Sequence, residues 1–156
     1  MAALESGHAA TQHAAAWGVL HSAMHGASIA DQLAAGGVLP PLLALHGGVD
    51  GDAAACAKGA LKEVARHCTE TAPLLPLVRA DTAPDLLSHV LQQALRIMQS
   101  SVASRRDFVT TGALAALQQL EPRLDGKGVA CAAAINALFP QDVVSYYRHG
   151  VQRAAR

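Results

Sequence analysis

Histidine is the residue type of this sequence that first suggests metal chemistry, because the chain has eight of them. His21 and His25 are four residues apart, a spacing that places two imidazoles on one face of a helix. No glutamate adjoins them as in the H-E-x-x-H motif of zinc hydrolases, and the nearest acidic residue in the sequence is Asp31. We therefore expect no bound metal and no cofactor.

Nucleophilic catalysis finds equally little support among the cysteines and serines. Cys68 follows His67 directly, but neighbouring residues of a helix point in different directions. The sequence contains no G-x-S-x-G elbow, phosphate-binding loop or dinucleotide fingerprint. Three cysteines without a C-x-x-C pair predict free, buried or half-buried thiols at Cys56, Cys68 and Cys131. The sequence thus predicts that the protein is not an enzyme.

Composition restricts both the core and the partners. Of the 156 residues, 51% are hydrophobic and 3% aromatic, so the core must be built from alanine, leucine and valine, which let helices approach closely. The formal net charge is zero, which predicts no general attraction to nucleic acid or to an anionic membrane. With no apolar run near 18 residues and no leader pattern, we expect a cytoplasmic protein.

Apolar residues recur at helical spacing along most of the chain. The pattern predicts helices over 11–25, 28–35, 38–46, 53–67, 85–99, 101–111, 113–120 and 129–139. Residues 71–79 contain two prolines, which predict a short, irregular helix pair. Residues 142–147 are predicted to form a short amphipathic segment. Ser28 and Asp52 are predicted to cap the helices that follow them.

Glycines mark sharp corners between helices. Gly36 and Gly37 separate two predicted helices, and Gly112 repeats the pattern 76 residues after Gly36. A second similarity relates 18–23 to 59–64 at a spacing of 41. Periods near 40 in a helical pattern indicate stacked repeats. We therefore predict an all-α, right-handed α-solenoid of armadillo/HEAT-like repeats, with 1–13 as lead-in, about three to four repeats over 14–147, and a tail over 148–156.

In an armadillo array, one helix of each repeat lines a concave groove, and its residues one turn apart form a ladder. Following the repeat spacing places the predicted partner-binding residues at Trp17, His21, His25, Lys58, Lys62, Arg66, Gln92, Arg96 and Asn136. Four of them are cations and none is a carboxylate, which predicts a positive face for an acidic partner. The alternatives are an ordinary solvated helix face and, for Trp17, a place in the core.

Two motifs near the end of the chain carry a family resemblance. F-V-T-T-G-A-L at 108–114 and I-N-A-L-F-P-Q-D-V-V-S-Y-Y at 135–147 resemble the C-terminal end of the sperm-associated antigen six family. A-P-D-L-L-S-H-V-L at 83–91 and A-W-G at 16–18 extend the likeness, whereas 148–156 departs from it. Its members are longer armadillo-repeat proteins of the central pair apparatus of motile flagella and cilia. The resemblance implies a non-enzymatic structural protein of the axoneme, associated with microtubules and needed for motility.

Two hypotheses follow. The first is an axonemal scaffold of the cytoskeleton whose partners are axonemal proteins, tubulin or microtubules, and which self-associates through the exposed N-terminal repeat end around Trp17 and Leu20. The second is a soluble armadillo adaptor that binds an acidic peptide segment in its groove. The second predicts loss of binding when Lys62 and Arg96 are changed to glutamate.

Overall fold

The computed structural model describes residues 2–48 and 51–154, with side chains described for 2–48 and 51–148. Every regular element in these ranges is helical, which confirms the predicted all-α class. The chain divides into two compact units, unit 1 (Met1–Pro73) and unit 2 (Leu74–Arg156). Within the described residues no single helix is long and apolar enough to cross a membrane. One pair of consecutive helices, Ala27–Ala35 and Leu39–Gly48, reaches the required length and apolar composition together, but the two are bent by 79° relative to each other.

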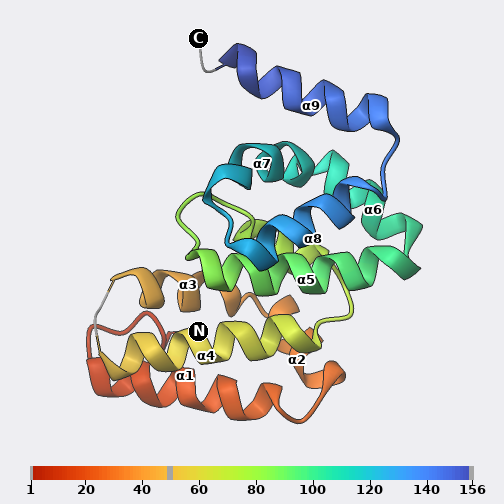
Figure 1. Cartoon of the computed structure of the whole chain (residues 1–156). Coiled ribbons are helices and arrows are strands. Elements are labelled where there is room, and N and C mark those ends of the chain that lie inside the picture. Colours follow the sequence, from red (N-terminus) through yellow and green to blue (C-terminus); the bar gives the residue numbers. More distant parts are fainter. Residues whose placement is uncertain (1, 49–50, 155–156) are drawn as a thin grey trace. The chain divides into compact units, whose positions relative to one another are not determined.

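Unit 1 is built around one central helix. Its helices are α1 (Ala9–Ala23), α2 (Ala27–Ala35), α3 (Leu39–Gly48) and α4 (Asp52–His67). The first three all pack against α4 (Figure 1). The buried face of α4 is apolar and mostly small: Ala53, Ala54, Ala57, Ala60, Leu61, Val64 and Ala65. The side chain of Leu20 lies against Gly59, where an added Cβ would be 3.5 Å from its Cδ2, so α1 and α4 meet closely.

A carboxylate ties α2 to the end of α4. Asp31 of α2 accepts a hydrogen bond from the Thr69 backbone N–H at 2.8 Å and another from the Thr69 hydroxyl at 2.6 Å. Both donors belong to the turn directly after α4, where backbone groups have no helical partner. The contact joins residues 38 positions apart and so holds α2 in place on the unit.

Unit 2 is organised around the longest helix of the described chain. It contains α5 (Pro84–Ser100), α6 (Val102–Thr110), α7 (Ala113–Leu120), the 3₁₀ helix η2 (Glu121–Arg123), α8 (Gly126–Asn136) and α9 (Gln141–Ala154). Helix α5 packs against α8, and α7 against α9 (Figure 1). The buried apolar side chains of α5 form one wide stripe: Leu86, Leu87, Val90, Leu91, Ala94, Ile97 and Met98.

The α-helices that the sequence predicts are present, but their ends differ from the prediction by a few residues. Residues 71–79 form one 3₁₀ helix, η1 (Ala72–Leu77), rather than a helix pair. Pro76 inside it lacks the N–H that a regular α-helix would need. The final segment is longer than expected, because α9 continues to Ala154 and so includes most of the predicted tail. Residues 155–156 of that tail lie outside the described part.

The two predicted caps are wrong by one or two positions. Gly26 occupies the N-cap position of α2, so Ser28 lies inside the first turn, where its hydroxyl accepts a hydrogen bond from the Gln32 amide at 3.4 Å. Gly51 likewise precedes α4, and Asp52 is its first helical residue. There the carboxylate faces the positive end of the helix dipole and stabilises α4 without capping it.

Both glycine corners are present, and the left-handed residue of the first is Gly37. Its φ is 78°, close to the 81° of Gly112, whereas Gly36 has a helical φ of −70°. In each corner the left-handed N–H donates at 3.0 Å to a carbonyl near the helix end, Gly37 to Ala34 and Gly112 to Val109. The two corners are therefore equivalent at a spacing of 75 residues rather than 76.

Gly37→Ala is expected to destabilise unit 1 by about 1–2 kcal/mol, because a side chain at this φ crowds the following carbonyl. Gly36→Ala is the matched control and should cost clearly less, because alanine adopts the helical φ of this residue and a Cβ there would come no closer than 3.2 Å to the Gln32 carbonyl oxygen. Urea unfolding followed by the fluorescence of Trp17, the one tryptophan of the sequence, measures both variants. An equal or larger loss for Gly36→Ala would contradict the assignment of the left-handed position.

Candidate partner-binding surface

The aromatic rings of Trp17 and His21 contact each other on the exposed face of α1. Trp17 is 53% exposed, and its ring lies 4.0 Å from that of His21 between centroids, tilted by 42°. His21 and His25 are exposed as well, but His25 lies beyond the last residue of α1 in a turn, where its N–H bonds the Ser22 carbonyl at 3.1 Å. The sequence allowed Trp17 to lie either in the core or on the surface, and in the structure it lies on the surface.

The predicted cations of unit 1 are on α4. Lys58 and Lys62 are half-buried, and Arg66 is exposed. The Arg66 guanidinium pairs with the Glu63 carboxylate, and His67 Nε2 lies 3.1 Å from the same Glu63 Oε1. Glu63 therefore offsets part of the positive charge at this end of α4. Its i,i+3 and i,i+4 spacing to Arg66 and His67 is the signal that could have predicted this cluster.

In unit 2 two of the predicted residues, Gln92 and Asn136, line different pockets. Gln92 and Arg96 are exposed on α5, and Gln92 lines a pocket of about 380 Å³ with Ser88, His89, Lys127, Ala130 and Cys131. Asn136 lines another pocket, of about 500 Å³, and its Oδ1 accepts a hydrogen bond from the Gln118 amide at 2.8 Å. One turn before Asn136, Ala132 is 1% exposed, so that step of the ladder presents no side chain to a partner.

Asp125 caps α8 and links it to α5. One carboxylate oxygen, Oδ1, accepts hydrogen bonds from the Ser88 hydroxyl and from the Gly128 backbone N–H, each at 2.7 Å. These bonds, the one from Ser88 first, lower the pKa of the Asp125 carboxyl. An aspartate before a helix start is a local signal for the cap. Ser88 lies 37 residues upstream, so no local pattern reveals the link between the helices.

Cys56, Cys68 and Cys131 form no disulfide, and their thiols are buried or half-buried as predicted. Burial raises the pKa of Cys68 to about 12, and the carboxylates of Asp31 and Glu70 add to this effect. Burial also raises the pKa of Cys56 and of Cys131. Because the thiolate is the nucleophilic form, none of the three is activated. Among the side chains that the structure describes, those of 2–48 and 51–148, no three histidine, cysteine, aspartate or glutamate residues gather where they could hold a metal ion.

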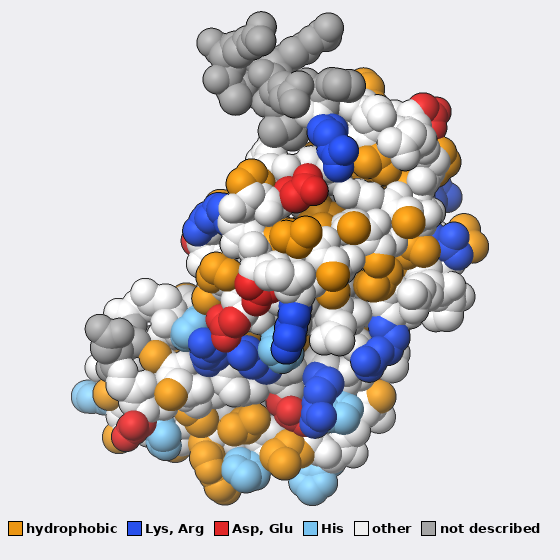
Figure 2. Space-filling view, viewed as in Figure 1, with side chains coloured by type: hydrophobic (Ala, Val, Ile, Leu, Met, Phe, Trp, Pro, Cys, Tyr) orange, Lys and Arg blue, Asp and Glu red, His pale blue; other side chains and the backbone are white. Residues whose placement is uncertain are grey.

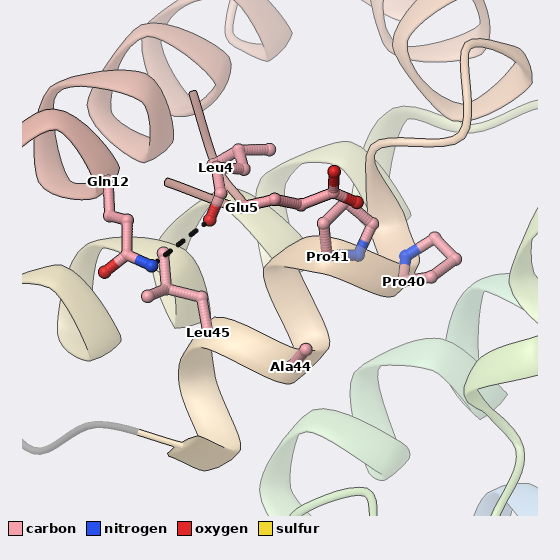
Figure 3. A pocket seen from close by; sticks show the side chains of 7 residues that line it. All are labelled: Leu4, Glu5, Gln12, Pro40, Pro41, Ala44 and Leu45. Atoms are coloured by element: carbon pink, nitrogen blue, oxygen red, sulfur yellow. Dashed lines mark hydrogen bonds between the residues drawn. The ribbon is translucent and has the colours of Figure 1, made fainter. Parts of the chain in front are cut away.

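A further pocket in unit 1, of about 410 Å³, involves none of the predicted residues (Figure 3). It lies between the segment before α1, α1 itself and α3, and the Gln12 amide closes one side by donating to the Leu4 carbonyl at 3.4 Å. Its lining is mostly apolar: Leu4, Glu5, Gln12, Pro40, Pro41, Ala44 and Leu45. Three separate segments supply these residues, so periodicity within one helix does not predict the pocket.

Comparison with known proteins identifies two relatives. The chain is 30% identical over 139 residues to Sperm-associated antigen 6 of Homo sapiens, and equally to Sperm-associated antigen 6 of Mus musculus. Each match covers 88% of this chain and 27% of the relative, so the chain spans about a quarter of the length of these proteins. No protein-family model matches. The chain is therefore related to Sperm-associated antigen 6 over most of its sequence, as its motifs predicted.

Proposed function

We propose that this chain is a non-enzymatic structural segment of the central apparatus of flagellar or ciliary axonemes, where it makes protein or microtubule contacts needed for motility. The match to Sperm-associated antigen 6 over 88% of the chain carries the proposal. The name of these relatives associates them with sperm. The axonemal part rests on the motifs at 108–114 and 135–147 and on what their family resemblance implies.

We infer an armadillo-type solenoid from a helix pattern that occurs once in each unit. In unit 1, α2, the Gly37 corner and α3 precede the longer α4. In unit 2, α6, the Gly112 corner and α7 precede α8. In both units the last helix packs on the long helix that comes before the set, α4 on α1 and α8 on α5. Stacking of each third helix on the previous one supports a repeat array.

This pattern assigns α1, α4, α5 and α8 to equivalent positions, which are the helices of the predicted ladder. Lys58, Lys62 and Arg66 on α4 and Arg96 on α5 are its cations. The positive charge of these side chains suits the acidic tails of tubulin as a partner. Each exposed contact would contribute about 1 kcal/mol or less and would weaken with salt.

Co-sedimentation with microtubules tests this proposal. We expect the chain to pellet at low salt, to release as salt rises, and to lose affinity when the acidic tubulin tails are removed. Lys62→Glu with Arg96→Glu should weaken binding by about tenfold, which corresponds to about 1.4 kcal/mol over two contacts. Arg79→Glu with Arg106→Glu is the control, because it makes the same change in net charge at exposed positions outside the predicted ladder and its pockets.

Two results would contradict the microtubule part of the proposal. Equal losses in the control pair would show an effect of net charge rather than of the ladder. Absence of pelleting at low salt, together with binding of an acidic peptide that needs Lys62 and Arg96, would favour the adaptor hypothesis instead.

A further inference from the structure

Helix α1 presents an exposed stripe along its whole length. We call this set the α1 outer stripe, and its members are spaced three or four residues apart: Ala10, Ala14, Trp17, His21 and Met24. Trp17 is 53% and Met24 57% exposed, whereas Ala16 and Ala23 on the opposite side of the helix are fully buried. Figure 2 shows hydrophobic and histidine side chains beside one another over α1, at the lower edge of the view.

The α1 outer stripe is also free of charged residues, because α1 contains no aspartate, glutamate, lysine or arginine. The solvent face of a surface helix normally carries such residues. Exposed tryptophan and methionine side chains that follow one another along a helix indicate a surface that another molecule covers. A charged partner would lose hydration there without gaining an ion pair, whereas a second copy of the same stripe brings no charge to the contact.

Side-chain size along the stripe gives the direction of such a contact. The small residues Ala10 and Ala14 occupy its first half, and the large Trp17, His21 and Met24 its second half. In an antiparallel pair whose two-fold axis passes between positions 15 and 16, Trp17 of each copy lies opposite Ala14 of the other. In the same register His21 lies opposite Ala10. At both of these pairs a large side chain meets a small one, as a self-complementary two-fold interface requires. Met24 lies opposite position 7, before the start of α1.

We propose that a second copy of this chain docks on the α1 outer stripe as an antiparallel helix pair in this register. From Ala10 to Met24 the stripe is about 21 Å long, because a helix rises about 1.5 Å per residue. One helix face is small beside the roughly 800 Å² per partner of a standard interface, so the dimer is weak and forms at micromolar concentrations or above. Leu20, which the sequence placed in the contact, packs half-buried against Gly59 and lies outside it.

Sedimentation equilibrium across about 5–500 μM tests this register through a size exchange. Ala14→Trp places tryptophan opposite tryptophan and should weaken association at least tenfold. The double variant Ala14→Trp, Trp17→Ala exchanges the large and the small position and should restore it. Both residues are exposed, so neither change disturbs the core. Val102→Glu on α6, at a position that is 74% exposed, is the control and should leave association unchanged.

Three outcomes would overturn the proposal. The wild-type chain could remain monomeric over the whole range. It could associate as strongly with Ala14→Trp as without it. The double variant could fail to recover what Ala14→Trp loses, which would exclude this register. The test needs no microtubules, so its result is independent of the proposed axonemal function.

Discussion

Replacing Phe108 by alanine should lower the free energy of unfolding of unit 2 by about 3–5 kcal/mol, the usual loss for a fully buried phenylalanine. Phe108 lies at the end of α6 with no exposed surface. Its ring stacks on that of Phe139, with centroids 6.3 Å apart and planes inclined by 23°. The substitution removes this contact and leaves a cavity next to the second corner, which the short helices α6 and α7 cannot close without moving.

Phe139→Ala is the matched control, because it removes the other ring of the same pair from a half-buried position. Its loss should be clearly smaller, since part of that side chain is already in water. Urea unfolding followed by far-UV circular dichroism compares the two variants with the wild-type chain. If Phe139→Ala proved the more damaging of the two, Phe108 would not be the anchor of this part of the core.

Gly128→Ala should destabilise unit 2 by about 2–3 kcal/mol, through crowding rather than loss of contact. A Cβ at this position would lie 2.8 Å from Ser88 Oγ and 3.0 Å from Leu124 Cβ. Ser88 cannot simply turn away, because its hydroxyl donates to the Asp125 carboxylate that caps α8. The added methyl group must therefore either push α8 away from α5 or break the bond between Ser88 and Asp125.

Gly126→Ala provides the comparison within the same helix. A Cβ there meets no atom within 4 Å, so this variant should be neutral or slightly more stable than the wild-type chain. The free energies of unfolding of both variants are measured by the same denaturant titration. Similar losses at Gly126 and Gly128 would show that helix propensity or the cap, and not the approach to Ser88, determines the effect.

Helices and corners were predictable because their signals are local. The apolar spacing of α5 and the glycines at both corners depend on residues within a few positions of one another. The predicted caps Ser28 and Asp52 are wrong because their side chains favour the cap position, whereas Gly26 and Gly51 occupy it in the structure. Helix ends therefore differ from the prediction by a few residues, and 71–79 differs in number and type of helix as well, whereas the other predicted helices are present.

The surface was less predictable, because it depends on contacts between segments far apart in the sequence. The ladder spacing found exposed residues on α1 and α5, but it could not show that Ala132 is buried. Nor could it show that Gln92 and Asn136 line separate pockets. The pair of Glu63 and Arg66 has a local sequence signal, because the two residues are three positions apart, but repeat spacing alone does not include Glu63. The bond from Ser88 to Asp125 had no sequence signal at all.

Cys68 provides a natural reporter of opening in unit 1. Its thiol is fully buried directly after α4, and a pKa raised to about 12 keeps it protonated at neutral pH. A thiol-modifying reagent needs both access to the sulfur and its thiolate form. Modification of Cys68 therefore requires that the end of α4 separate from its surroundings, including the contact between Asp31 and Thr69. The rate of that reaction therefore measures how often this part of unit 1 opens while the rest of the protein stays folded.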